Sequence, residues 1–183
     1  PRLDKLASQS LNLTSFYAGS PACSASRYCM LTGKSPARSG FARWVLNPGD
    51  KTYIDKRDSI IPETLKQAGY ITGMIGKWHL GVPNKANNFD VNALPAARGF
   101  DSYVGIPYSN DMTPSPLIRQ PGDSKEYPSA ELVELPVDQQ NLTRFYFNEA
   151  CAFVEKNKGR PFFLYLTPSM PHVPLFASEG FEG

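Results

Sequence analysis

The 183-residue sequence predicts an α/β fold with a mainly parallel sheet flanked by helices. Segments typical of strands alternate with segments typical of helices, a pattern that favours parallel strands joined by crossover helices. The length suffices for one domain with a sizeable core. The net charge of +2 gives no argument for binding to nucleic acid or to an anionic membrane surface.

The first predicted strand leads into a helix that carries candidate site residues. Residues 11–17 mix apolar and β-branched side chains and are expected to form this strand. Gly-Ser-Pro at 19–21 is typical of a loop and a helix start, so Cys23 should lie in the first turn of the next helix, with Arg27 on the same face. Free N–H groups and the helix dipole suit this position to sulfate or phosphate.

A second helix and a second strand follow in the middle of the chain. Residues 62–68 begin with proline and are followed by Gly69, which is typical of a short helix. Residues 70–75 are predicted to form a buried strand, and Lys77 and His79 come directly after it. Residues two apart in an extended segment face the same way, so these two side chains should point together. Open α/β sheets usually bind ligands at this edge.

The second half of the chain contains a polar stretch, a long helix and a final strand. Residues 113–136 are rich in proline and charge without a clear period, which predicts a surface excursion that shapes a substrate pocket or is simply a tolerated insertion. Asp138 is the expected cap of the helix, and residues 162–166 are the expected strand. The apolar face of the helix comprises Leu142, Phe145, Tyr146, Ala150, Phe153 and Val154.

Two short motifs stand in order along the chain, CSASR at 23–27 and GYITGMIGKWH at 69–79. They resemble the two signatures of the type I sulfatases, a family with an alkaline-phosphatase-like fold. The first resembles the signal C-x-(P/A)-x-R, whose cysteine is oxidised to formylglycine after synthesis. Two motifs in the family order are far more specific than one. The segment GIPYSND at 105–111 is most similar to the arylsulfatase A branch.

The resemblance implies that residues 1–183 are part of the N-terminal catalytic domain of a sulfatase. In this family an Asp-Asp pair that binds calcium comes before the region that matches Pro1. An Asp-Asn pair and a lysine complete the site after the region that matches His172. Neither set is present in this sequence. We therefore expect an internal piece of a sulfatase, with little or no activity by itself.

The resemblance also implies a role for each motif residue. Cys23, as hydrated formylglycine, is the expected nucleophile, and Arg27 is expected to hold the hydrate. Lys77 is expected to place its charge on the sulfate oxygens. His79 is the expected base, and His172 is expected to contact the sulfate and to protonate the leaving oxygen.

The resemblance gives a further substrate contact and a metal. Ser109 matches a serine near the substrate sulfate in the arylsulfatase A branch. Asn110 and Asp111 are expected either to face the substrate or to cap their loop. The implied cofactor is calcium, and Cys23, as formylglycine, is the only one of the family's protein ligands to it in this sequence.

The implied substrate is a sulfated small molecule or a sulfated glycan, and the implied maturation partner is a formylglycine-generating enzyme. We expect a periplasmic, secreted or lysosomal protein, on the resemblance alone. No apolar run approaches the roughly 20 residues of a membrane-spanning helix. Two alternatives stay open: a formylglycine-dependent phosphodiesterase or phosphonate hydrolase of the same superfamily, and a non-catalytic module that binds sulfated glycans.

Overall fold

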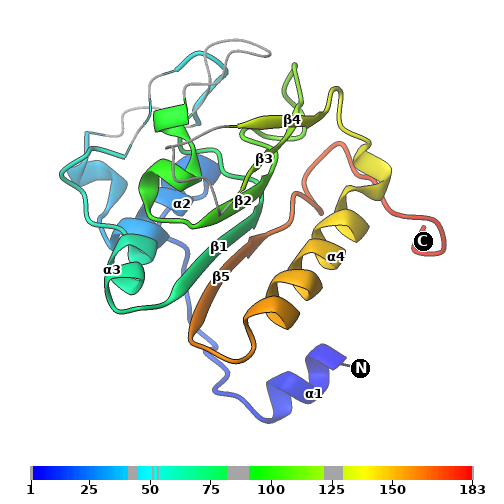
Figure 1. Cartoon of the computed structure of the whole chain (residues 1–183), viewed down its shortest axis with the longest axis horizontal. Coiled ribbons are helices and arrows are strands. Elements are labelled where there is room, and N and C mark those ends of the chain that lie inside the picture. Colours follow the sequence, from blue (N-terminus) through cyan, green and yellow to red (C-terminus); the bar gives the residue numbers. More distant parts are fainter. Residues whose placement is uncertain are drawn as a thin grey trace.

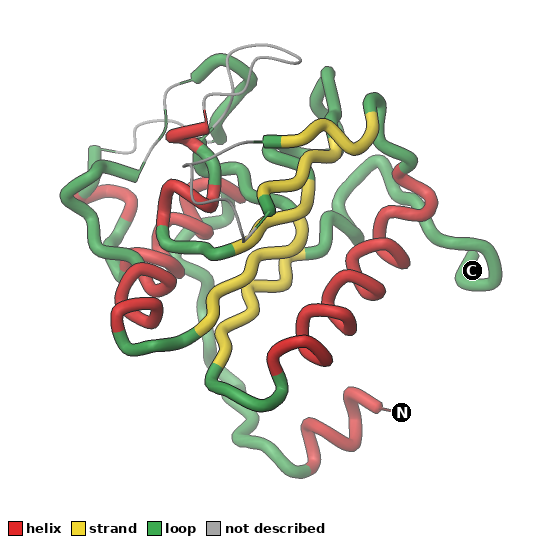
Figure 2. The backbone as a smooth tube through the Cα atoms, viewed as in Figure 1, coloured by secondary structure: helices red, strands yellow, loops and turns green. Residues whose placement is uncertain are grey.

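The computed structural model describes residues 2–40, 45–50, 52, 54–81, 91–121 and 130–182 (Figures 1 and 2). Their helices are α1 (Arg2–Ser8), α2 (Cys23–Thr32), α3 (Ile61–Gln67) and α4 (Gln139–Asn157), with short 3-10 turns at Pro36–Arg38, Val91–Ala93 and Pro95–Arg98. Their strands are β1 (Ile71–Gly76), β2 (Ser102–Gly105), β3 (Leu117–Gln120), β4 (Glu131–Glu134) and β5 (Phe162–Thr167). No described helix is both long and apolar enough to cross a membrane.

The strands form one sheet in the order β4-β3-β2-β1-β5. β1 pairs in parallel with β2 and with β5, whereas β2–β3 and β3–β4 are antiparallel pairs. The α/β class is confirmed, but the expectation of a mainly parallel sheet is wrong because the sheet is mixed. No helix stands between β2 and β3 or between β3 and β4 among the described residues, and neighbouring strands joined without a crossover run in opposite directions.

The stretch 113–136 holds two strands for which the sequence predicted only a surface excursion. Leu117 and Ile118 in β3 are buried in the apolar clusters on opposite faces of the sheet. β4 pairs with β3 and is exposed along its length. Residues 122–129 of this stretch lie outside the described residues. Leu117 and Ile118 hold this segment against the rest of the sheet, although the neighbouring residues in the sequence are mostly polar or proline.

The strand expected at 11–17 is not present. These residues form an exposed loop, and the side chains of Leu11 and Tyr17 are each 85% exposed. A strand needs a neighbour to satisfy its backbone N–H and C=O groups, and no described strand pairs with this segment. Helix α1, which precedes the loop, likewise buries none of its residues.

Helix α4 covers the face of the sheet opposite to α2 and α3 (Figure 1). Asp138 caps it, because its carboxylate accepts hydrogen bonds from the N–H groups of Gln140 and Asn141. Leu142, Tyr146 and Ala150 are buried against the sheet, and Phe145 and Phe153 are partly buried there. Val154, which was expected on the same face, is 40% exposed. Each step of four residues turns by about 40° around the helix, so the row drifts away from the sheet.

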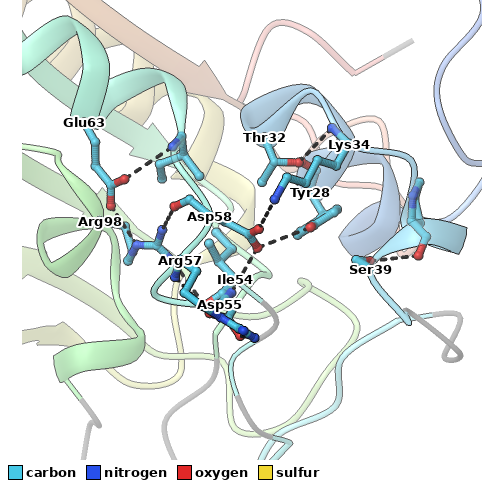
Figure 3. A network of polar contacts seen from close by, with 12 residues as sticks. Tyr28, Thr32, Lys34, Ser39, Ile54, Asp55, Arg57, Asp58, Glu63 and Arg98 are labelled. Carbon is cyan, nitrogen blue, oxygen red and sulfur yellow. Dashed lines mark hydrogen bonds and ion pairs between the residues drawn. The ribbon is translucent and has the colours of Figure 1, made fainter.

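A partly buried polar network joins the far end of α2 to the start of α3 (Figure 3). Asp58 accepts hydrogen bonds from Lys34 Nζ at 2.6 Å and from the Tyr28 hydroxyl at 3.2 Å. Arg98 donates to the Asp58 carbonyl oxygen at 2.8 Å and forms an ion pair with Glu63 at 2.9 Å. Because Tyr28 and Cys23 belong to one helix, the network also fixes the position of the Cys23 end of α2.

The carboxyl ends of β1, β2 and β5 approach one another closely. Gly76, at the end of β1, has a φ of 116°, and a Cβ there would lie 2.1 Å from the Thr167 carbonyl oxygen of β5. A Cβ on Gly105 in β2 would lie 1.9 Å from the Gly76 carbonyl oxygen. Both positions therefore require glycine, and the close approach brings the residues after β1 beside the ends of both neighbours.

Gly105→Ala is expected to lower the free energy of unfolding by roughly 2–3 kcal/mol, because the new methyl group would push against backbone that cannot swing away. Gly159→Ala is the matched control, since nothing lies within 4 Å of a Cβ there. Urea denaturation of both variants measures the difference. Equal loss of stability in the two variants would contradict the close approach of β1 and β2.

Candidate active site

The site begins at the amino end of α2, where Cys23 is the first helical residue. Ala22 is the N-cap and has no side chain that can accept a hydrogen bond from the first turn. Cys23 is half-buried and its thiol is free. The terminus thus offers N–H groups and a positive dipole end beside the Cys23 side chain, as the sequence predicted.

Arg27 lies one turn further along α2 and reaches the end of β1. Its Nη1 donates a hydrogen bond to the Lys77 carbonyl oxygen at 2.5 Å, and the Thr167 hydroxyl donates to the same oxygen at 2.9 Å. Burial lowers the pKa of Arg27, and the nearby Tyr165 and Cys23 side chains partly oppose this shift. The guanidinium of Arg27 stays charged at neutral pH because its ordinary pKa lies far above neutral pH.

Lys77 brings a buried positive charge to Cys23. The residue is 2% exposed, and its Nζ donates a hydrogen bond to Ser109 Oγ at 2.7 Å. Burial lowers the pKa of Lys77, and the charge of Arg27 adds to this effect, whereas electrostatic attraction and a hydrogen bond to the Cys23 side chain raise it. Lys77 therefore links Cys23 to Ser109.

His79 has a φ of 59°, the only positive φ of a non-glycine residue in the described chain. The expectation that it follows Lys77 in an extended segment is wrong, because β1 ends at Gly76. The two side chains are nevertheless close enough to interact. Burial lowers the pKa of His79 to about 4, and the charge of Lys77 contributes further to this fall. His79 is therefore neutral at neutral pH.

The hydrogen bonds of His79 identify which ring nitrogen carries its proton. Nε2 lies 2.8 Å from the Leu46 carbonyl oxygen, which can only accept a hydrogen bond, so Nε2 carries the hydrogen. Nδ1 is buried and has no hydrogen-bond partner among the described atoms. Nδ1 thus holds a free lone pair inside the protein, suited to accepting a proton.

Asp111 and His172 extend the line of contacts beyond Ser109. Burial raises the pKa of Asp111, but a hydrogen bond from Ser109 and electrostatic interactions with His172 and Lys77 outweigh burial and lower this pKa below its usual value. The Asp111 carboxylate lies 4.0 Å from His172 Nδ1. The His172 side chain is one-third exposed, and its Nδ1 also contacts the Val173 carbonyl oxygen at 2.7 Å.

Asn110 holds the loop of His172 instead of facing outward. It is buried, and its Nδ2 donates hydrogen bonds to Gln139 Oε1 and to the Pro174 carbonyl oxygen, each at 3.2 Å. It also donates to the His172 carbonyl oxygen at 3.5 Å. Gln139 Nε2 returns a bond to the Asn110 carbonyl oxygen. Gln139 and Leu46 were not predicted as site residues, because nothing in a local motif identifies residues that act by holding backbone.

Consecutive contacts thus join the predicted site residues Cys23, Lys77, Ser109 and His172 through Asp111. Arg27 and His79 interact electrostatically with Lys77 in the same cluster. The described residues include no group of three His, Cys, Asp or Glu side chains that could hold a metal ion. The metal role of Cys23 stays a prediction.

The sequence matches the profile of the Sulfatase family over residues 1–183. It is 38% identical to an arylsulfatase from Hemicentrotus pulcherrimus, over 98% of this chain and 34% of the relative. It is 34% identical to the human N-acetylgalactosamine-6-sulfatase, over 100% of this chain and 37% of the relative. The chain thus spans about a third of the length of these relatives.

Two solved structures share the fold. One is the PsFucS1 sulfatase from Pseudoalteromonas sp., with a TM-score of 0.79 and 27% identity over 100% of this chain and 40% of the other. The second is a Bacteroides thetaiotaomicron protein described in work on glycosaminoglycan metabolism, with a TM-score of 0.74 and 25% identity over 95% of this chain and 46% of the other.

The low pKa of His79 predicts a pH dependence of stability. Between pH 6.5 and about 4 the unfolded chain binds a proton at His79 that the folded chain does not, so stability falls as the pH falls through this range. The full effect is about 3 kcal/mol. His79→Gln should remove this part of the slope in urea titrations, whereas His172→Gln should keep it. A His79→Gln slope equal to that of the wild type would contradict the neutral, buried imidazole.

Proposed function

Because the chain belongs to the sulfatase family, we propose that the protein hydrolyses sulfate monoesters with a nucleophile formed from Cys23. The observation that supports this most is the line of contacts from Cys23 through Lys77 to Ser109 at a helix amino terminus. This arrangement offers a positive charge, hydroxyl and N–H donors, and a reactive side chain to one tetrahedral anion.

Formylglycine at position 23 would supply a hydrated aldehyde, in which one hydroxyl attacks sulfur and the other later releases sulfate as the aldehyde re-forms. An unmodified cysteine has no second hydroxyl and therefore lacks this route. The maturation partner in this proposal is a formylglycine-generating enzyme. The half-buried position of Cys23 in the first turn leaves its sulfur at the edge of the site, beside Lys77.

Arg27 and Lys77 stabilise the negative charge that develops on the transferred group. Both are partly or wholly buried, and burial strengthens the attraction between their charges and an anion. An anion between them also relieves the repulsion between the two cations. Lys77 and Ser109 together are the proposed sulfate contacts.

His79 is the proposed base, acting through Nδ1. A bound sulfate ester places negative charge near the ring, offsets the charge of Lys77 and raises the pKa of His79 from its value of about 4. The ring then becomes a stronger base only when substrate is bound. Its Nε2–H bond to Leu46 keeps Nδ1 free for this task.

His172 is the proposed acid that protonates the leaving oxygen. Its Nδ1 is engaged by the Val173 carbonyl oxygen and lies near Asp111, so Nε2 is the nitrogen left for substrate. The Asp111 carboxylate lies 4.0 Å from His172 Nδ1 and helps to orient the ring of this proposed acid. Asn110 fixes the backbone of His172 and thereby the position of this acid.

Calcium enters the proposal only as the cofactor general to the family, where it would draw charge from the sulfate oxygens. Position 23 is the one described residue proposed to touch it. The proposed compartment is periplasmic, secreted or lysosomal. The relatives named as N-acetylgalactosamine-6-sulfatases favour a sulfated glycan substrate, with small aryl sulfates as the second substrate class.

The full-length protein, produced with a formylglycine-generating enzyme, should hydrolyse p-nitrophenyl sulfate faster than bis-p-nitrophenyl phosphate at equal concentration. Release of p-nitrophenol measures both reactions. A preference for the phosphate diester would replace this function with phosphodiesterase activity. Binding of a sulfated glycan without turnover of any sulfate ester would instead indicate a non-catalytic module.

Cys23→Ser should abolish turnover and leave a sulfated serine, because a single hydroxyl can accept the sulfo group but cannot release it through an aldehyde. Mass spectrometry of the Cys23 peptide after incubation with aryl sulfate detects the added sulfo group. Cys29→Ser is the matched control on the same helix and should keep activity. Multiple turnovers by Cys23→Ser would contradict the proposed route of sulfate release.

A further inference from the structure

We propose that Ser24 is a positioning residue for His79, because it holds the backbone of Leu46, whose carbonyl oxygen fixes the tautomer of the His79 ring. This inference deepens the proposed function and rests on it for its kinetic consequence. The link from Ser24 through Leu46 to His79 does not depend on any enzymatic activity. Ser24 directly follows Cys23 in α2, so one helix turn would supply both the nucleophile and the support of the base.

The link consists of two buried hydrogen bonds on either side of one residue. Ser24 is 0% exposed, and its Oγ accepts a hydrogen bond from the Leu46 N–H at 3.1 Å. The Leu46 carbonyl oxygen lies 2.8 Å from His79 Nε2. Leu46 itself is 1% exposed. Both polar groups of the Leu46 backbone are therefore engaged, one by α2 and one by His79, where water cannot replace either partner.

The apolar side chain of Leu46 cannot set this orientation. It packs with Tyr108 in a small cluster, and apolar contact holds a residue in place without fixing the direction of its carbonyl group. A hydrogen bond is directional and weakens steeply when it is bent. The bond to Ser24 fixes the amide plane before Leu46, and the bond from the Asn47 N–H to Asp50 Oδ2 at 2.8 Å fixes the plane that contains the Leu46 carbonyl, so Ser24 holds Leu46 in place from one side while Asp50 holds it from the other.

The direction of that carbonyl decides the chemistry of His79. With Nε2–H directed at Leu46, the lone pair is on Nδ1, which is buried and has no described partner. If the carbonyl turned away, the proton could move to Nδ1 and block the lone pair that the proposed base needs. The charged groups that act on the ring are Lys77, Arg27 and Asp111. None of them is an acceptor for Nε2 in the structure, so they do not replace Leu46.

The first experiment reads the tautomer directly by NMR of the full-length protein labelled with ¹⁵N-histidine. The sequence has only two histidines, so a His172→Gln spectrum assigns both. Wild-type His79 should show the Nε2–H tautomer at neutral pH. Ser24→Ala should shift the ring signals toward a mixture of tautomers. Ser24→Thr, which keeps the hydroxyl, should restore the wild-type signals, and Ser26→Ala is the control on the same helix.

The second experiment measures kinetics with p-nitrophenyl sulfate, normalised to the formylglycine content of each variant by mass spectrometry. Ser24→Ala should lower kcat by roughly tenfold with little change in KM, since it weakens the base and not the sulfate contacts. Its rate should also depend on pH differently from the wild type. Ser26→Ala should match the wild type in both respects.

Several results would overturn the role of Ser24. A wild-type His79 with its proton on Nδ1 would do so even if Ser24→Ala fails to fold. A Ser24→Ala protein with the wild-type tautomer and wild-type kcat would do so as well. If the wild type turns over no sulfate ester, the proposed function fails, and the NMR spectra still decide whether Ser24 orients His79.

Discussion

A hydrogen bond between a helix and a strand end joins the two halves of the site. Arg27 in α2 donates to the carbonyl oxygen of Lys77, which directly follows β1. The Thr167 hydroxyl at the end of β5 donates to the same oxygen, so that one carbonyl connects three elements. Because this group is buried, loss of either donor would leave a polar atom without its partner. The positions of Cys23, Lys77 and His79 relative to one another all depend on this junction.

The junction concentrates positive charge where little water can screen it. Burial lowers the pKa of Arg27, of Lys77 and of His79, the charge of Arg27 adds to the fall at Lys77, and the charges of Lys77 and Arg27 add to the fall at His79. The partly exposed carboxylate of Asp111 acts on both Lys77 and His79. In the proposed function, a sulfate group bound beside these cations compensates their unfavourable charge. The loop that carries Ser109, Asn110 and Asp111 connects this charge to His172.

The helices and strands that were predicted correctly are those whose own residues favour that secondary structure. Helix α4 has an N-cap and an apolar row, α3 has an early proline and a following glycine, and β1 is a compact apolar run. The strand expected at 11–17 and the mainly parallel sheet were wrong for one reason. A strand exists only with a partner, and local sequence does not say which segment pairs with which, or in which direction.

The reactive groups of the site can be named from the residues alone: a cysteine and an arginine one helix turn apart, a lysine and a histidine after a strand, and a second histidine far along the chain. Their motifs also indicated the family. How these groups are held follows from contacts that form in the folded chain. The tautomer of His79 depends on the carbonyl of Leu46, and the placement of His172 depends on Asn110. Such support comes from backbone atoms and distant side chains, whose contacts arise only when the chain is folded and leave no local pattern of residue types.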